Sequence, residues 1–509
     1  MCLYCLMAFR ATILIHLRRY FVLAAAAIAP ACLLLPTSTA SAAGDRPAGI
    51  IGPGVSAIAI AVNPDTDTGY SWAEKYGDPV NVIDLATGTV TASVTVPDAA
   101  EVLHQVLAVD PDTNTLYVSN YDNDSVVVIN GATNTVTQTI TGIQSPTAIT
   151  VDPATDMVYA AQRTGGIAVI NGVTGAVTGT VPAGEVTSMT VDPSTDTIYA
   201  GESYPGTIEV IDGETGTVTA RIAVPLTGGL ADNPATDTLY AASGPSVTAF
   251  SGSTNTAAGA VKLSAAPEGI AVNAATDTVF SADPGAGVLT LISGSADTVT
   301  GSLALTGATS VAVDPQTDTL LAVAGGETYV VALQPPAITS TSVTFTVGQQ
   351  QAVTIPASGT PAPDFTETGA LPAGLSLTSD GTLTGKPKPG TARTYQISVT
   401  AANGVAPAAT RAFRITVNQR PAFASARHVT FRAGAEHRFT IRATGMPVPT
   451  VTEKGKLPRG LRFTARKNGT AVISGRAARS AAGKTYTVML SASNNVGKPA
   501  TQRLIIKVS

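Results

Sequence analysis

A short phrase recurs seven times between Asn63 and Thr319, and its fullest form reads Asp-Pro-x-Thr-Asp-Thr. Its second residue stands at positions 64, 111, 153, 193, 234, 274 and 315, so the repeats differ little in length. A period of about 40 residues is typical of propeller blades of four strands, each of which buries its apolar faces against its neighbours. The repeats therefore predict an all-β protein that contains a seven-bladed β-propeller.

Each repeat alternates strand-like segments with turn signals. Asp or Asn before Pro favours a tight turn, because proline presets φ while the Asx side chain bonds the following backbone. Asn-Gly or Asp-Gly later in the unit suits a second hairpin reversal. The second strand of six units carries an aromatic residue that we expect to pack between blades: Tyr70, Tyr117, Tyr159, Tyr199, Tyr240 and Phe280. The last unit runs into Pro335-Pro336 without a fourth strand, so we expect residues near 46–53 to supply it.

These units resemble the YVTN-type seven-bladed β-propeller repeat family, most closely at Thr115-Leu116-Tyr117-Val118-Ser119-Asn120. The resemblance covers about residues 45–335, and we assign residues 44–335 to the propeller. It implies the fold and a role among surface proteins and binding modules, since one fold serves many functions.

Two further modules follow, at residues 336–418 and 419–509. Leu371-Pro372-Ala373-Gly374-Leu375 of the first returns in the second as Leu457-Pro458-Arg459-Gly460-Leu461. Alternating segments in both modules predict Ig-like β-sandwiches with one buried face per sheet. They resemble bacterial Ig-like, cadherin-like domains of extracellular proteins. The junction at 418–421 lacks clustered acids, so no metal site is expected there.

The first 43 residues have the order of a secretory signal peptide. Arg18-Arg19 precede an apolar stretch at 20–35, and small residues at 37–43 end it. The arginine pair leaves both the general secretory and the twin-arginine route open. Cys2, Cys5 and Cys32 all lie in this segment, so the mature chain would have no disulfide. We expect a secreted, extracellular protein without a transmembrane span, with cell-wall association as an open option.

Charge is divided sharply between the modules. Residues 44–335 carry 30 acids and five bases, whereas residues 419–509 carry two acids and 17 bases. A field of that sign attracts anionic polymers. An anionic cell-envelope polymer is therefore one expected partner, and the acidic propeller itself is the alternative. The expected polyanion-binding residues surround the second Leu-Pro-x-Gly-Leu turn: Arg459, Arg462, Arg466 and Lys467.

No catalytic constellation stands out. The mature chain has three histidines, and it lacks HExxH, Gly-x-Ser-x-Gly and phosphate-binding glycine loops. We expect a non-enzymatic binding or adhesion-type protein without a cofactor or metal. Two alternatives stay open: an extracellular propeller enzyme of the lactonase or quinone-dehydrogenase kind, and a purely structural wall-associated protein.

Sequence variation among the repeats indicates where a ligand would bind. Strands alternate in direction, so the Asx-Pro and Asn-Gly turns share one face of the ring, and the variable connections share the other. Aromatic and charged residues on a variable face suit a protein or glycan ligand, and nucleic acid is not expected. The candidate ligand-binding residues are Trp72, Tyr76, His104, Tyr121, Asp124, Arg163, Glu202 and Tyr204.

Overall fold

The computed structural model describes residues 49–50, 57–73, 78–97 and 106–509. The expected signal peptide lies outside these ranges. The described chain consists of β-strands and two single-turn helices, η1 (Tyr121–Asn123) and η2 (Arg479–Ala481). None of the helices in these ranges has the length and apolar character needed to cross a membrane.

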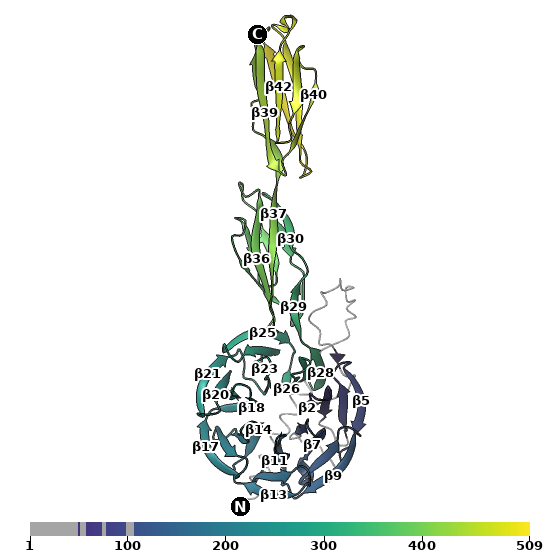
Figure 1. The fold of residues 1–509 in the computed structure, drawn as a ribbon, viewed down its shortest axis with the longest axis vertical. Coiled ribbons are helices and arrows are strands. Elements are labelled where there is room, and N and C mark those ends of the chain that lie inside the picture. The colour runs from purple at the N-terminus through teal and green to yellow at the C-terminus, as the bar shows by residue number, and fades with distance from the viewer. Residues whose placement is uncertain (1–48, 51–56, 74–77, 98–105) are drawn as a thin grey trace, which may run out of the picture. The chain divides into compact units, whose positions relative to one another are not determined.

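Seven four-stranded antiparallel sheets form the propeller, and in Figure 1 they surround a central opening. The first strands, nearest the opening, are β2 (Ala59–Asn63), β6 (Leu107–Asp110), β10 (Pro146–Asp152), β14 (Val186–Asp192), β18 (Leu226–Asn233), β22 (Gly269–Asn273) and β26 (Ala308–Asp314). The second strands are β3 (Thr68–Trp72), β7 (Thr115–Asn120), β11 (Met157–Gln162), β15 (Thr197–Glu202), β19 (Thr238–Ser243), β23 (Thr278–Asp283) and β27 (Thr319–Ala324).

The third and fourth strands complete each blade. The third strands are β4 (Val80–Asp84), β8 (Ser125–Asn130), β12 (Gly166–Asn171), β16 (Thr207–Asp212), β20 (Ser246–Ser251), β24 (Val288–Ser293) and β28 (Glu327–Ala332). The outer strands of blades one to six are β5 (Thr89–Val94), β9 (Thr135–Thr141), β13 (Val177–Val181), β17 (Thr217–Ala223), β21 (Thr256–Lys262) and β25 (Thr298–Ala304). In the seventh blade, β1 (Gly49–Ile50) pairs antiparallel with β28, so the N-terminal segment closes the ring as predicted.

The repeated aromatic residues are buried, as expected. Tyr70, Tyr117, Tyr159, Tyr199, Tyr240 and Phe280 are 1–3% exposed. Tyr117 Oη reaches the carbonyl oxygen of Gly172 in the next blade at 3.4 Å. Burial, with Asp110 and Asp156 nearby, raises the pKa of Tyr117 to about 12. The aromatic row therefore packs between neighbouring blades, as in the clusters that join Tyr70 to Leu116 and Phe280 to Leu320.

The Asn-Gly and Asp-Gly pairs begin the second reversal of their blades, as expected. The residue with positive φ stands three positions after the glycine, as at Gly175 (φ 69°), and the Gly175 N–H donates to the Asn171 carbonyl oxygen. A Cβ on Gly172 would lie 2.7 Å from both Tyr117 Oη and the Asp156 carbonyl oxygen. Glycine is needed here because the neighbouring blade approaches so closely.

The Asx-Pro turns also link neighbouring blades. Asp110 Oδ1 accepts the backbone N–H of Asp112 at 3.0 Å, which is the turn capping that the sequence predicts. Where Asn begins the turn, its amide donates to the next blade, as from Asn273 to Asp318 Oδ1 at 2.7 Å. Where Asp begins the turn, its carboxyl lies close to the carboxyl of an Asp in the turn of the next blade, as for Asp152 and Asp196. Burial and Asp152 raise the pKa of Asp196 to about 6.

Two β-sandwich modules follow the propeller. The first contains β29 (Gln334–Ile338), β30 (Ser342–Thr346), β31 (Gln351–Thr354), β32 (Ala357–Thr360), β33 (Asp364–Thr368), β34 (Leu375–Leu377), β35 (Thr382–Gly385), β36 (Thr394–Ala402) and β37 (Ala409–Phe423). The second contains β38 (His428–Phe431), β39 (Glu436–Met446), β40 (Thr450–Gly455), β41 (Leu461–Ala465), β42 (Thr470–Arg476), β43 (Thr485–Ser493) and β44 (Ala500–Val508).

A single long strand connects the two sandwiches. The first part of β37 pairs with β36 in the first module, and its last residues pair with β39 in the second. Asn403 and its counterpart Asn494 hold equivalent positions: each side-chain amide donates to the carbonyl oxygens of an entering strand and of a cis-proline loop. The module repeat seen in the sequence is thus a repeat of structure.

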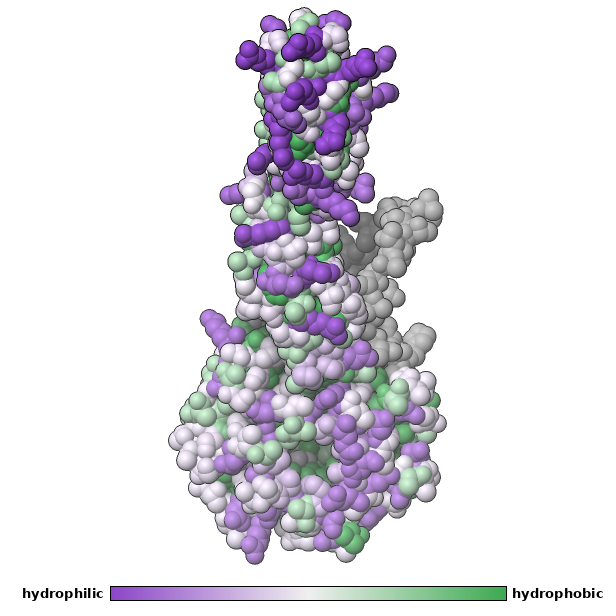
Figure 2. Space-filling model, turned by 45° about the horizontal axis from the view of Figure 1, so that its top comes forward, coloured by the Kyte–Doolittle hydropathy of each residue, from purple (hydrophilic) through white to green (hydrophobic). Residues whose placement is uncertain are grey.

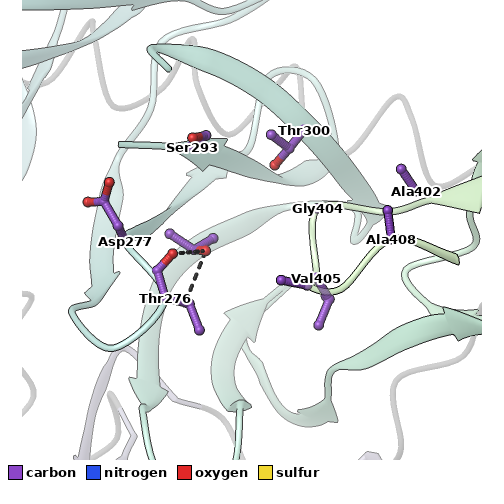
Figure 3. Close-up of a pocket in the computed structure, with 10 residues that line it drawn as sticks. Thr276, Asp277, Ser293, Thr300, Ala402, Gly404, Val405 and Ala408 are labelled. Atoms are coloured by element: carbon purple, nitrogen blue, oxygen red, sulfur yellow. Dashed lines mark hydrogen bonds between the residues drawn. The ribbon is translucent and has the colours of Figure 1, made fainter. Parts of the chain in front are cut away.

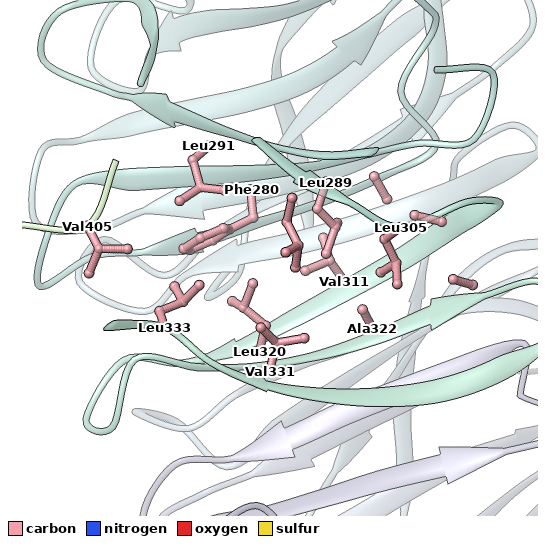
Figure 4. Packing of buried hydrophobic residues seen from close by; sticks show 14 residues of the cluster. Phe280, Leu289, Leu291, Leu305, Val311, Leu320, Ala322, Val331, Leu333 and Val405 are labelled. Atoms are coloured by element: carbon pink, nitrogen blue, oxygen red, sulfur yellow. The ribbon is translucent and has the colours of Figure 1, made fainter. Parts of the chain in front are cut away.

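The first sandwich docks on the sixth blade through the loop after β36. Val405 joins a buried cluster that includes Phe280, Leu291 and Leu333 (Figure 4). A Cβ on Gly301 would lie 2.3 Å from the Asn403 carbonyl oxygen, so the outer strand β25 admits the loop only because it carries glycine there. A pocket of about 420 Å³ beside this contact is lined by small and hydroxyl-bearing residues (Figure 3).

We expect Val405→Asp to release this docking loop. An unpaired carboxylate in the cluster would cost about 3 kcal/mol, more than one apolar contact supplies. Hydrogen exchange should then rise at residues 403–407 while the blades stay protected. Val496→Asp, the equivalent change in the second sandwich, is the control and should leave exchange at 403–407 unchanged. Unchanged exchange in Val405→Asp would contradict the docking role.

Candidate functional site

The first strands of all seven blades surround one cavity of about 560 Å³. It lies at the end of the ring where these strands begin, because Thr187 and Ser188 stand at the start of β14 and Ser203 follows the end of β15. This is the side of the variable connections, named here the loop face; the side of the Asx-Pro turns is the turn face. Figure 2 shows the ring hollowed near its centre.

The cavity wall is rich in hydroxyl groups. Among the described residues that line it, Glu268 is the one charged side chain, and it is exposed. The hydroxyl-bearing lining residues are Thr187, Ser188, Ser203, Thr227, Thr309 and Ser310. The first strands are also the edge strands of their sheets, and edge strands present unpaired backbone groups. The wall is therefore suited to hydrogen bonding.

Contacts between blades hold this wall in shape. The Leu230 N–H donates to Ser188 Oγ at 3.0 Å, and the Gly229 N–H donates to the Glu268 carbonyl oxygen at 2.7 Å. A Cβ on Gly228 would lie 2.3 Å from that same carbonyl oxygen. The Gly228-Gly229 pair thus lets the fifth blade come close enough to fix the Glu268 backbone at the cavity.

Trp72 is not a surface anchor, contrary to the sequence-based prediction. It is 1% exposed and packs in the core cluster with Tyr70, Val80 and Leu107. Its indole N–H donates to the Asp78 carbonyl oxygen at 3.1 Å. The Trp72 side chain can be buried in the first blade because its ring is apolar and its single hydrogen-bond donor has a backbone partner.

Glu202 is also buried, at 7% exposure, so its predicted role as an exposed ligand contact is wrong. Glu202 Oε1 accepts the Gly184 N–H at 2.7 Å. Side chains at the equivalent positions of two other blades also bond to their connections: Gln162 accepts from the Gln144 N–H at 2.9 Å, whereas Asn120 donates to the Pro97 carbonyl oxygen at 3.0 Å. The last residue of these second strands fastens the connection that enters its blade.

The other described candidates lie on the loop face. Arg163 is exposed, and its Nη1 donates to Tyr121 Oη from the neighbouring blade. Tyr204 is 89% exposed and follows Ser203, which lines the cavity. Asp124 has φ 46° and accepts the Ser145 N–H at 2.8 Å, so its carboxylate holds a connection between blades. The structure brings Tyr121 and Arg163 together.

Tyr76 and His104 lie outside the described residues. The four predicted polyanion-binding residues, Arg459, Arg462, Arg466 and Lys467, are all exposed. They do not form one cluster around the turn: Arg459 precedes β41, whereas Arg466 and Lys467 follow it.

Sequence reasoning missed the cavity residues themselves. Most of the candidates came from the variable connections between the second and third strands of a blade. The cavity is instead lined by the beginnings of the first strands. The sequence does contain one signal for the cavity: Gly228-Gly229 stands where the preceding repeat has Thr187-Ser188. In the described chain no three His, Cys, Asp or Glu residues are grouped as metal ligands would be.

Comparison with known proteins identifies the first sandwich. Residues 335–418 match the family He_PIG, described as "Putative Ig domain". Kuenenia stuttgartiensis hydrazine synthase is a similar solved structure, with a TM-score of 0.48, 17% sequence identity, and coverage of 56% of this chain and 97% of that chain. The search of curated proteins returned no match.

Proposed function

We propose that this protein is a secreted bacterial binding protein whose propeller, of the YVTN type, holds its ligand at the cavity on the loop face. One observation carries the proposal: all seven blades contribute to a single hydroxyl-lined cavity of about 560 Å³. Concave sites with a few convergent polar groups are the usual places for ligand recognition. The Ig-like modules act as spacers, and the signal-like segment at 1–43 supports export.

The chemistry of the cavity selects among ligands. Its charged lining residue is Glu268, and the surrounding propeller has a net charge of −25 over residues 44–335. Such a field repels anions and attracts cations. The ligand is a glycan or protein segment that presents hydroxyl or amino groups. Asp232, the acid whose pKa burial raises to about 8, does not line the cavity, which favours binding over acid–base catalysis.

We expect Glu268→Gln to weaken binding of a cationic ligand about tenfold, since one charge-assisted hydrogen bond contributes about 1.4 kcal/mol. The probes are immobilised glucosamine oligomers and their N-acetylated counterparts, tested with the full-length protein by surface plasmon resonance. Wild type should prefer the amino oligomers, and Glu268→Gln should lose that preference.

The matched control is Glu214→Gln, which removes the same charge from an exposed acid on the turn face. It should bind like wild type. If neither oligomer binds, or if both variants lose binding equally, the cavity is not the site and the proposal fails.

A further inference from the structure

The outer face of one sheet in the second sandwich collects arginines from two strands. In β39 the inward side chains, such as Ile441, belong to the core cluster, and the alternate residues Arg438 and Arg442 are exposed. Across the sheet, Arg438 lies opposite Ser474 of β42, and Ser474 lies opposite Arg462 of β41. Directly paired residues share a face, so Arg438 and Arg462 flank one hydroxyl.

A second row repeats this arrangement. Arg442 lies opposite Thr470, and the Arg466 N–H donates to the Thr470 carbonyl oxygen at 2.9 Å in the hairpin that follows β41. Because side chains alternate along a strand, residue 466 continues the face of residue 462. The four residues Arg438, Arg442, Arg462 and Arg466 are named the arginine quartet. Strand geometry places its rows about 13 Å apart and the arginines within a row about 10 Å apart.

The sheet surface between the quartet residues is mostly polar and carries no acidic side chain. The intervening outward residues are Thr440, Thr464, Thr470, Ser474 and Val472, of which Val472 is 4% exposed although it is outside the core cluster. Long side chains often cover such a residue with their apolar stems. Among the described residues there is one salt bridge, and it joins Arg221 to Glu209 of the propeller. No arginine of the quartet is paired with an acid there, so each guanidinium is free to bind.

Only two acids occur in residues 419–509, and neither lies among the quartet. Glu436 stands beyond Arg438 at the start of β39, opposite Arg476, and Glu453 belongs to β40 in the other sheet. Strongly hydrophilic side chains gather on this module in Figure 2. The quartet is thus a patch of positive charge, bordered at the start of β39 by Glu436, which lies on the same face opposite Arg476.

We infer that the arginine quartet is a docking face for a linear polymer that carries phosphate or carboxylate groups along its length. Guanidinium groups bind both anions through two parallel hydrogen bonds. A flat face with charges about 10–13 Å apart suits an extended chain rather than one small ion. The outward residues between the arginines offer hydroxyls rather than aromatic rings. Nucleic-acid bases therefore have no aromatic side chain to stack on at this face. This inference is independent of the propeller cavity.

The test measures retention of the full-length protein on immobilised polyphosphate, polygalacturonate and uncharged dextran. Wild type should bind one or both charged polymers and not dextran, and the stronger of the two identifies the anionic group. The variant Arg438→Gln, Arg442→Gln, Arg462→Gln, Arg466→Gln should bind about 30-fold more weakly, with a clearly shallower salt dependence because four fewer charges are neutralised.

A matched variant separates the face from the net charge of the module. Arg427→Gln, Lys454→Gln, Arg503→Gln, Lys507→Gln removes the same four charges from exposed positions away from the quartet. It should keep most of the binding, and circular dichroism should be unchanged in both variants. Equal losses would show that only net charge acts, and the inference would fail.

Two other outcomes would also overturn the inference. Failure of wild type to bind either charged polymer at low salt means that the face is covered, for instance by the acidic propeller. Tighter binding to phosphatidylglycerol vesicles than to both polymers means that the face recognises a membrane. Loss of propeller binding through Glu268→Gln would change none of these measurements, so the two proposals fail separately.

Discussion

Asp232→Val is expected to stabilise the propeller by about 3 kcal/mol at pH 7, because it removes a carboxyl that the fold accommodates poorly. The equivalent residue of the other six repeats is valine: Val62, Val109, Val151, Val191, Val272 and Val313. Valine and aspartate are similar in volume, so the substitution should fit without repacking.

The environment of Asp232 explains the expected gain. Its Oδ2 atom is buried without a hydrogen-bond partner. Burial, with the carboxylates of Asp192 and Asp237 nearby, raises the pKa of Asp232 to about 8. The hydroxyls of Tyr199 and Tyr240 also lie close enough for Asp232 to raise their pKa values. No cation faces this carboxyl among the groups that shift its pKa.

The effect should depend on pH in a defined direction. A carboxyl whose pKa is higher in the folded state binds its proton more tightly there, so acid favours folding. The associated stability is complete below about pH 4, the unfolded value, and is lost as the pH rises to about 8. Urea unfolding at pH 4 to 9 should show wild type weakening across this window.

The free energy of unfolding of Asp232→Val should change less with pH over the same window. Asp112→Asn, at an exposed turn-face position, is the control and should change stability by less than about 0.5 kcal/mol. An Asp232→Val protein that is less stable than wild type at pH 8 would mean that the carboxyl has a partner that compensates for its burial.

Trp72→Ala is expected to destabilise the propeller by about 4 kcal/mol, because it removes a large side chain from a packed core. The lost contacts include Tyr70 and Leu107, and the substitution also leaves the Asp78 carbonyl oxygen without its indole donor. Urea unfolding followed by circular dichroism measures the loss. Trp72 is the sole tryptophan of the chain, so the wild-type transition can also be followed by its fluorescence.

Trp72→Phe keeps most of the volume and should lose about half as much stability. Tyr204→Ala, at an 89% exposed position on the same face, should leave stability within about 0.5 kcal/mol. If Trp72→Ala instead kept its stability and lost ligand binding, Trp72 would be a recognition residue after all.

Much of the fold could be predicted from the sequence because the signals are local and repeated. Turn chemistry such as that at Asp110-Pro111, which recurs in every repeat with Ala274 in place of proline in the sixth, determined the number of blades and the direction of their strands. The missing fourth strand after Thr328 predicted that an N-terminal strand would close the ring, and β1 does so. Alternation likewise predicted the two sandwiches.

The candidate site was less predictable, because exposure is a property of packing rather than of position in a loop. Trp72 and Glu202 stand at the variable ends of strands, yet both are buried and bonded to backbone groups. The cavity exists only because seven first strands, each from a different repeat, converge on one point.

The sequence by itself determined the period, the strand pattern and the division of charge between modules, since each depends on residues close together in the chain. Tertiary structure alone decided which polar groups meet. The register of β39, β42 and β41 sets Arg438 beside Arg462, a residue distant in the chain, across Ser474. Hydrogen bonds between strands fix such pairs, and a one-residue slip would send every side chain to the opposite face.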